Sequence, residues 1–135
     1  MEIRQFKPED EGYVIRLWEI CGLTVPWNDP KLDIQMKLEV QPELFLVGAI
    51  DTRIVATVMA GYDGHRGWLY SLSVDPEYQR AGLGRNIVEA AIIRLKMQGC
   101  RKVNLQVRTS NVEVIGFYEK IGFSIDDTVS MGKRL

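Results

Sequence analysis

The chain has 135 residues, 46% of them hydrophobic, which is enough for one domain with its own apolar core. Its 17 Lys and Arg residues almost balance 18 Asp and Glu residues, so a nucleic-acid-binding surface is not expected. No apolar run approaches the roughly 20 residues that span a bilayer, and no signal-peptide core follows Met1, so membrane attachment is not expected either. Cys21 and Cys100 form no metal or redox motif, and as free thiols they suit a cytoplasmic protein.

The first part of the chain predicts a strand and two helices. Residues 2–6 form the strand, and Pro8, followed by three acidic residues, suits the start of a helix. A second helix is expected after Asp29-Pro30, because Asp caps helix N-termini and Pro fits the first helical position. The apolar residues in 32–38 nevertheless alternate with period two, as they do in a strand.

The middle of the chain predicts three consecutive strands. Residues 45–50 and 54–62 are apolar and rich in β-branched side chains, and the short polar stretch between them is typical of a hairpin. Residues 68–74 continue the sheet until Asp75-Pro76, where proline ends the strand.

The last part of the chain predicts alternating helices and strands. Apolar residues at helical spacing indicate a long helix that stops at Gly99, and a strand follows over residues 103–107. A shorter helix is expected over residues 114–121, and the tail, residues 123–135, is expected to add one or two strands. The fold class is therefore α/β, a mixed sheet covered by helices, in a single domain over residues 1–135.

The loop before the long helix suggests phosphate binding. Gly82 and Gly84 precede the helix, whose N-terminal N–H groups and partial positive charge attract anions. Glycine lets the backbone approach a phosphate closely, and Arg80 and Arg85 add positive charge. In the simpler interpretation, the glycines only let the loop turn into the helix.

Two common phosphate motifs do not fit this loop. A P-loop requires GxxxxGK[ST], and no Lys-Ser or Lys-Thr pair follows the glycines. The dinucleotide fingerprint GxGxxG requires a third glycine, where this chain has Ile87. It also requires an acidic residue at the end of the next strand, and no suitable one stands there.

The same residues resemble the motifs of the GNAT superfamily of N-acetyltransferases. Gln79-x-x-Gly82-x-Gly84 resembles its acetyl-CoA signature [RQ]xxGx[GA], and it follows a Val-x-Pro strand end as in that family. Downstream, Asn111 and the segment Phe117-Tyr118-Glu119-Lys120-Ile121-Gly122-Phe123 resemble the family's N…FYxxxGF element. Residues 26–30, 61–67 and 132–135 further resemble the YpeA-like branch of bacterial GNAT proteins.

The resemblance implies a GNAT fold, with splayed parallel strands, and a set of residues for acetyl-CoA, which is the co-substrate and needs no metal. The amide of Leu72 is implied as a donor to the oxyanion that develops at the thioester. Asn111 is also compatible with a simple helix N-cap. The implied cofactor-binding residues are Leu72, Ser73, Val74, Gln79, Arg80, Ala81, Gly82, Leu83, Gly84, Arg85, Asn111 and Tyr118.

Tyr118 matches the family's general acid, which protonates the departing thiolate. The general base is less clear, because Gln106 stands where the ribosomal-protein N-terminal acetyltransferases of this superfamily have Glu, and an amide cannot accept the proton. His65, the only histidine, is the catalytic candidate in its place, since imidazole titrates near neutrality. Alternatives are Asp63, Tyr70 or Glu77 acting through water.

The implied function is transfer of an acetyl group to a primary amine, on a small molecule or a protein lysine. The acceptor is expected between residues 26–30 and residues 63–67, where Trp27 could pack against it and Asp29 or Asp63 could pair with its amine. The resemblance allows a homodimer, because small GNAT proteins are often dimers through their terminal strands, but the sequence does not determine the oligomeric state. One alternative is a CoA-binding sensor or partner module that has lost catalysis, which Gln106 supports and Tyr118 argues against. Another is an unrelated nucleotide-phosphate binder.

Overall fold

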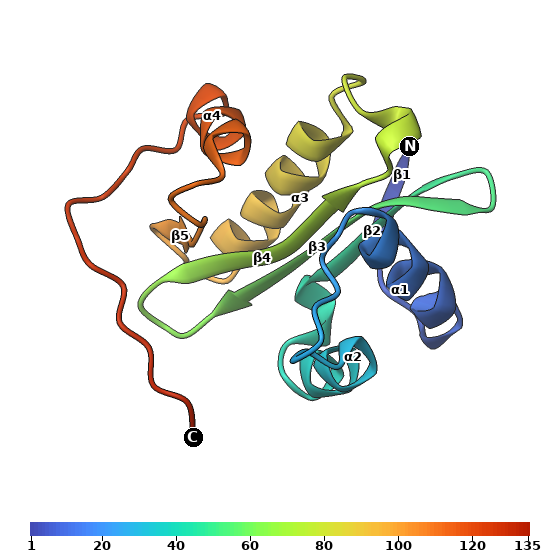
Figure 1. Ribbon diagram of the computed structural model, residues 1–135, viewed down its shortest axis with the longest axis horizontal. Coiled ribbons are helices and arrows are strands. Elements are labelled where there is room, and N and C mark those ends of the chain that lie inside the picture. Colours follow the sequence, from blue (N-terminus) through green and yellow to red (C-terminus); the bar gives the residue numbers. More distant parts are fainter. The chain divides into compact units, whose positions relative to one another are not determined.

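The computed structural model describes all 135 residues, which form two compact units, Met1–Leu105 and Gln106–Leu135. The first unit holds every strand (Figure 1). Its elements in chain order are β1 (Glu2–Gln5), the 3-10 turn η1 (Pro8–Asp10), α1 (Glu11–Ile20), α2 (Pro30–Glu39), η2 (Pro42–Leu44), β2 (Phe45–Ile50), β3 (Arg53–Tyr62), β4 (Gly67–Val74), η3 (Pro76–Tyr78), α3 (Leu83–Met97) and β5 (Val103–Leu105).

The five strands of the first unit form one mixed sheet in the order β1–β2–β3–β4–β5. Successive strands from β1 to β4 pair in antiparallel fashion, whereas β5 pairs in parallel with β4. A parallel pair requires a crossover connection, which α3 provides. The expected mixed α/β sheet is confirmed.

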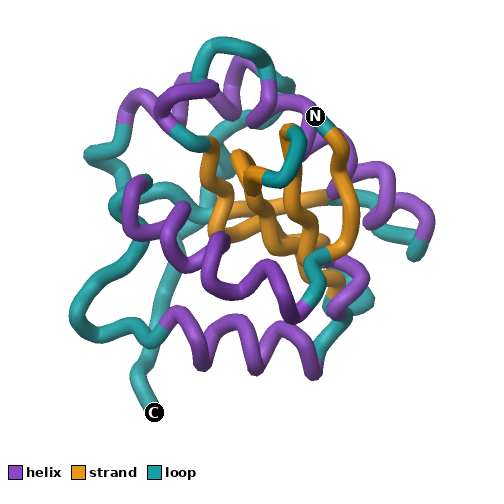
Figure 2. Tube along the Cα trace, turned by 90° about the vertical axis from the view of Figure 1, so that its right-hand side faces the viewer, coloured by secondary structure: helices purple, strands orange, loops and turns teal.

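Helices cover both faces of this sheet (Figure 2). On one face, Val14, Leu17 and Trp18 of α1 and Ile34 of α2 pack in one buried cluster with inward side chains of β2 and β3. Val14, Leu17 and Trp18 recur at helical spacing, which is why α1 presents a single apolar stripe. On the other face, α3 buries Ile87, Val88, Ala91, Leu95 and Leu83. None of the helices is both long and apolar enough to cross a membrane.

The N-terminal signals of α2 prevail over its strand-like alternation. The Asp29 carboxylate accepts the backbone N–H groups of Lys31 and Leu32, at 3.0 and 3.3 Å, and Pro30 occupies the first helical position. Only Ile34 and Lys37 of this helix are buried, so its inner stripe is narrow and the outer apolar residues are exposed. The helix predicted from the cap is confirmed.

The second unit contains α4 (Val112–Lys120) and an extended tail. The Asn111 side chain accepts the backbone N–H of Val114 at 3.4 Å, so the helix begins with the expected N-cap. The prediction of strands in residues 123–135 is wrong, because no strand follows α4. The tail's apolar residues, such as Ile125 and Val129, are exposed, so neither a strand nor a helix covers them.

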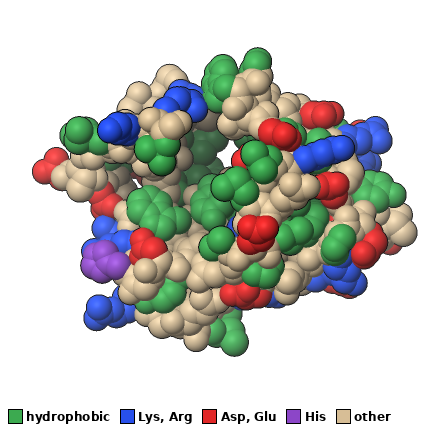
Figure 3. Space-filling model, turned by 90° about the horizontal axis from the view of Figure 1, so that it is seen from below, with side chains coloured by type: hydrophobic (Ala, Val, Ile, Leu, Met, Phe, Trp, Pro, Cys, Tyr) green, Lys and Arg blue, Asp and Glu red, His purple; other side chains and the backbone are tan.

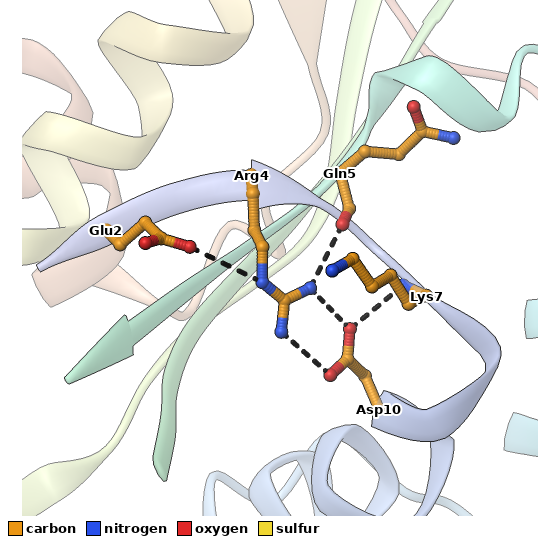
Figure 4. Close-up of polar contacts among 5 residues, drawn as sticks. All are labelled: Glu2, Arg4, Gln5, Lys7 and Asp10. Carbon is orange, nitrogen blue, oxygen red and sulfur yellow. Dashed lines mark hydrogen bonds and ion pairs between the residues drawn. The ribbon is translucent and has the colours of Figure 1, made fainter. Parts of the chain in front are cut away.

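A partly buried ion pair joins β1 to the start of α1 (Figure 4). The Arg4 guanidinium donates to both carboxylate oxygens of Asp10, at 2.7 and 3.0 Å, and the Lys7 backbone N–H donates to Asp10 Oδ2 at 2.9 Å. Burial of Asp10 by itself would raise its pKa, but the hydrogen bonds from Arg4 and Lys7 outweigh burial and lower it. The ionised carboxylate is therefore the form that stabilises this corner.

Replacement of Asp10 by Asn should lower the free energy of unfolding by about 2 kcal/mol at pH 7, because a buried, doubly bonded carboxylate is lost. A carboxylate whose folded pKa is lowered stabilises above its unfolded pKa of about 3.9, and this contribution disappears as the pH falls through the folded value. Urea titrations between pH 7 and pH 3 should therefore show the two proteins converging at acid pH. Glu9→Gln, at an exposed neighbour, is the control. Equal stabilities at pH 7 would contradict the role of Asp10.

Candidate active site

Strand β4 contains a bulge just before the predicted phosphate loop. Thr57 of β3 pairs with Ser73 and Met59 pairs with Tyr70, so Val58 faces two residues, Ser71 and Leu72. Ser71 has a φ of 54°, in the left-handed region that non-glycine residues rarely adopt. A bulge re-aims the backbone groups of the strand, and bulges are common beside active sites.

The parallel ladder between β4 and β5 ends early. It joins Gly67, Trp68 and Leu69 to Val103, Asn104 and Leu105, and it stops there. Residues 70–74 of β4, which include the bulge, therefore lie beyond the last paired residue of β5. Open α/β sheets bind ligands where neighbouring strands part at their carboxyl ends.

The turn that follows β4 is held by charged side chains. The Asp75 side chain is buried, accepts the Glu77 backbone N–H at 2.9 Å and pairs with the Arg53 guanidinium at 2.8 Å. Arg53 also pairs with Glu77 at 3.0 Å and lies over the ring of Tyr78, 5.4 Å from its centroid. Arg53 is the first residue of β3, so these contacts fix the first part of the loop to the β2–β3 hairpin.

The second part of the loop leads into the N-terminus of α3 in a strained conformation. Arg80 and Gly82 have φ values of 71° and 77°, and Gly82 is the N-cap of the helix without a side-chain hydrogen bond. Only glycine adopts such a φ without steric cost, which explains Gly82. The first N–H groups of the helix have no partner within it and are free to bind an anion.

Most of the sequence-predicted cofactor residues lie together in the first unit. Leu72, Ser73 and Val74 form the end of β4, and residues 79–85 form the loop and the first turn of α3. The side chain of Gln79 donates to the Val74 carbonyl oxygen at 3.4 Å, which ties the loop back to the strand. Arg85 faces Glu89 one turn later, at 2.9 Å, so part of its positive charge is already compensated.

The remaining predicted residues belong to the second unit. Tyr118, near the end of α4, is buried and makes edge-on ring contacts with Phe117 and Phe123 at centroid distances of 5.0 and 5.3 Å. Burial raises the pKa of Tyr118 to about 12. Gln106 is exposed, and its side-chain amide donates to the Ser130 hydroxyl.

The structure places His65 away from the loop. It lies exposed in the turn between β3 and β4, as the purple side chain of Figure 3 shows. Gly67 and Val74 are the two ends of β4, so at about 3.3 Å per residue they lie roughly 20 Å apart. In the same turn, the Asp63 carboxylate accepts the N–H groups of Arg66 and His65, which lower its pKa. Asp63 shapes the turn, which leaves it a weak base.

The predicted acceptor region contains an exposed aromatic residue and a buried cation. Trp27 is 62% exposed, whereas Asp29 is occupied as the cap of α2. Lys37 on α2 is buried and donates to the Ala60 carbonyl oxygen at 2.5 Å, and its ammonium lies 5.8 Å from the ring centroid of Tyr70. Burial lowers the pKa of Lys37 and raises that of Tyr70. A phenol whose pKa is raised stays protonated at neutral pH, so Tyr70 is a poor base.

Three supporting residues were not predicted from the sequence. Arg53 anchors the loop, Lys37 lies under Tyr70, and the buried hydroxyl of Thr57 lies at the bulge. Lys37 and Thr57 each stand at an inward position of an apolar pattern, and a polar residue there is the one signal that could have marked them.

The chain is similar to known acetyltransferases in sequence and in fold. Residues 12–123 match the Acetyltransferase (GNAT) family. An acetyltransferase of Yersinia pestis (strain Pestoides F) is 48% identical over 135 residues, covering 100% of this chain and 96% of the relative. The ribosomal-protein-S18-alanine N-acetyltransferase from Escherichia coli aligns with a TM-score of 0.75 and 26% identity, over 91% of this chain and 77% of that one.

A more distant neighbour shows the same fold. AAC(6')-Iy, solved in complex with the bisubstrate analogue CoA-S-monomethyl-acetylneamine, aligns with a TM-score of 0.79 at 15% identity, over 99% of this chain and 97% of that one. Its sheet and helices confirm the fold expected from the motifs. With a family match over most of its length and a full-length relative at 48% identity, the chain belongs to the GNAT family of acetyltransferases.

Proposed function

We propose that this protein transfers the acetyl group of acetyl-CoA to a primary amine. The observation that carries the proposal is the run of bulge, anchored loop and helix N-terminus over residues 71–85, beyond the end of the β4–β5 ladder. Such a run offers backbone groups to an extended thiol arm and free N–H groups to a pyrophosphate. AAC(6')-Iy, a protein of the same fold, was solved with a CoA bisubstrate analogue, which supports CoA as the ligand here.

The proposed reaction is direct attack of the amine on the thioester. The nitrogen forms a bond to the acetyl carbon, the carbonyl oxygen becomes negative, and the Leu72 amide stabilises that charge. The carbon–sulfur bond then breaks, the amine nitrogen loses a proton, and the CoA thiolate gains one. No covalent enzyme intermediate is needed, because the bulge and the loop hold the thioester in place for the incoming amine.

We assign the stabilisation of the thiolate to Tyr118. Since its pKa is raised to about 12, its hydroxyl keeps its proton at neutral pH and is available as a donor. A thiol has a reference pKa of about 8.5, so a free thiolate would not take the proton completely from this phenol. Tyr118 therefore acts by a hydrogen bond that strengthens as charge develops on sulfur, and the proton is finally supplied by solvent.

We propose that water accepts the proton that the amine loses. Asp63 accepts two backbone N–H groups in the β3–β4 turn, and Glu77 pairs with Arg53. His65 lies in that same turn, at the end of β4 away from the loop. A primary amine with a reference pKa of about 10.4 is mostly protonated at neutral pH. We therefore expect turnover to be slow at pH 7 and to rise with pH, because the fraction of unprotonated amine rises with pH.

The test of the proposed function is a screen of purified protein with acetyl-CoA against small amines and lysine peptides. Thiol release should exceed the hydrolytic background for at least one acceptor, and mass spectrometry should find that acceptor heavier by one acetyl group. If calorimetry shows acetyl-CoA binding and no amine is acetylated, the alternative of a CoA-binding sensor is supported. Gln106 favours that alternative, because an amide stands where related enzymes have a basic Glu. Absence of binding would exclude both.

The pH dependence of the active pair identifies the base. For two acceptors of different pKa, the acidic limb of kcat/KM should move with the acceptor and stay the same in His65→Gln. This outcome follows if only the uncharged amine binds productively and water takes the proton that its nitrogen loses after attack. An acidic limb near the imidazole reference of about 6.5 that vanishes in His65→Gln would make His65 the base.

A further inference from the structure

The bulge of β4 requires something to hold it. Ser71 adopts a φ of 54°, which costs a non-glycine residue free energy and persists only where the surroundings impose it. The carbonyl oxygen of Ser71 accepts a hydrogen bond from the Thr57 hydroxyl on β3, at 3.1 Å. Thr57 is fully buried, so water does not reach its hydroxyl. The constraint on Ser71 therefore comes from one side chain of the neighbouring strand.

Three partners surround the Thr57 hydroxyl, and their chemistry fixes the direction of every bond. The Trp18 indole N–H can only donate, and it lies 3.0 Å from Thr57 Oγ1. The Ser71 carbonyl can only accept, so the single hydroxyl proton of Thr57 must go to it. Ser73 Oγ, 2.6 Å away, must then donate to the remaining lone pair of Thr57. The hydroxyl thus uses its one donor and both acceptors.

The peptide plane carries this constraint to the amide that faces the substrate. The Ser71 carbonyl and the Leu72 N–H belong to one planar peptide unit, and the chain has no cis peptide bond. In a trans unit these two groups point in opposite directions. A hydroxyl that holds the Ser71 oxygen therefore aims the Leu72 N–H away from Thr57.

We propose that Thr57 is a positioning residue for acetyl transfer, fixed by Trp18 and Ser73, which sets the direction of the Leu72 amide. This inference rests on the proposed function, in which that amide stabilises the oxyanion. Thr57 itself is buried between α1 and the sheet and does not touch the reacting atoms. Its effect should appear in the rate of the chemical step more than in cofactor affinity, because phosphate contacts lie in the loop beyond β4.

Thr57→Val tests the inference, because valine keeps the shape and removes the hydroxyl. We expect kcat to fall about 10²-fold, the cost of misplacing a group by about 1 Å or losing an oxyanion donor, while KM for acetyl-CoA changes less than about threefold. Thr57→Ser retains the hydroxyl and should recover most of kcat. Leu95→Ala is the matched control, since it opens a fully buried site of α3 beside Gly67, at the end of β4 away from the bulge, and should leave kcat unchanged.

Two further measurements keep the outcomes separate. In the Thr57→Val protein, the amide resonance of Leu72 should shift by NMR, and in Leu95→Ala it should not. If the wild type transfers acetyl groups and Thr57→Val keeps its kcat, the positioning role is refuted. If the wild type transfers none, the proposed function fails, and an unmoved Leu72 resonance would refute the positioning role separately. Should Thr57→Val not fold, Trp18→Phe removes the indole donor and should lower kcat in the same direction.

Discussion

Replacement of Gly84 by Val is expected to abolish acetyl-CoA binding while the protein stays folded. Gly84 is the second residue of α3, where the free N–H groups of the helix are proposed to meet the pyrophosphate. A β-branched side chain at this position would keep the phosphate from the backbone. Losing two charge-assisted hydrogen bonds, at about 1.5–3 kcal/mol each, lowers affinity by at least about 10²-fold.

Gly84 is a cleaner test than Gly82. Gly82 has a φ of 77°, so any side chain there would strain the backbone and alter the loop itself. Gly84 lies within α3 and has no positive φ, and valine has a better helix propensity than glycine. A change of affinity in Gly84→Val can therefore be attributed to the site.

The chain offers a matched control for this substitution. Gly12 is likewise the second residue of a helix, α1, and no atom lies within 4 Å of where its Cβ would be. Gly12→Val should bind acetyl-CoA with wild-type affinity in calorimetry, and far-UV circular dichroism should be native for both variants. Unchanged affinity in Gly84→Val would remove the pyrophosphate assignment.

Tyr118→Phe is expected to lower kcat by about 10²-fold and to leave the Kd for acetyl-CoA nearly unchanged. The hydroxyl is proposed to act on charge that exists only as the thiolate departs, so ground-state binding does not depend on it. The ring contacts with Phe117 and Phe123 remain in the variant, because phenylalanine retains the ring. Rapid-mixing measurements of thiol release and calorimetry separate the two quantities.

The pKa of Tyr118 adds a second criterion. The protonated phenol is the active form, and with a pKa of about 12 it persists throughout the accessible alkaline range. The ratio of wild-type to Tyr118→Phe rates should therefore stay constant between pH 7 and pH 10. Tyr13→Phe, at an exposed tyrosine of α1, should behave as wild type. Wild-type kcat in Tyr118→Phe would reduce this residue to ring packing.

The sequence by itself determined those features whose cause is local. A helix N-cap such as Asp29, a strand-ending proline and the two-glycine loop act within a few residues of where they stand. The sequence patterns therefore locate α2, the end of β4 and the start of α3 without knowledge of any tertiary contact. The motif that resembles the acetyl-CoA signature is of this kind, because a glycine and the helix N-terminus that follows it present free backbone N–H groups whatever lies elsewhere in the chain.

The tertiary structure alone decided the features that depend on a distant partner. The tail of residues 123–135 contains strand-forming residues, yet a strand exists only where another edge pairs with it, and the ladders end at β5. The bulge at Ser71 could not be predicted, because the Ser71 carbonyl oxygen bonds to Thr57, 14 residues away, and Thr57 in turn accepts from Trp18, 39 residues from Thr57. His65 and Leu72 are close in sequence, but His65 precedes the start of β4 and Leu72 lies near its end, so most of the length of this extended strand lies between them. Neighbourhood along the chain specifies capping and turns, whereas catalytic geometry is set by hydrogen bonds between strands and helices that no local pattern contains.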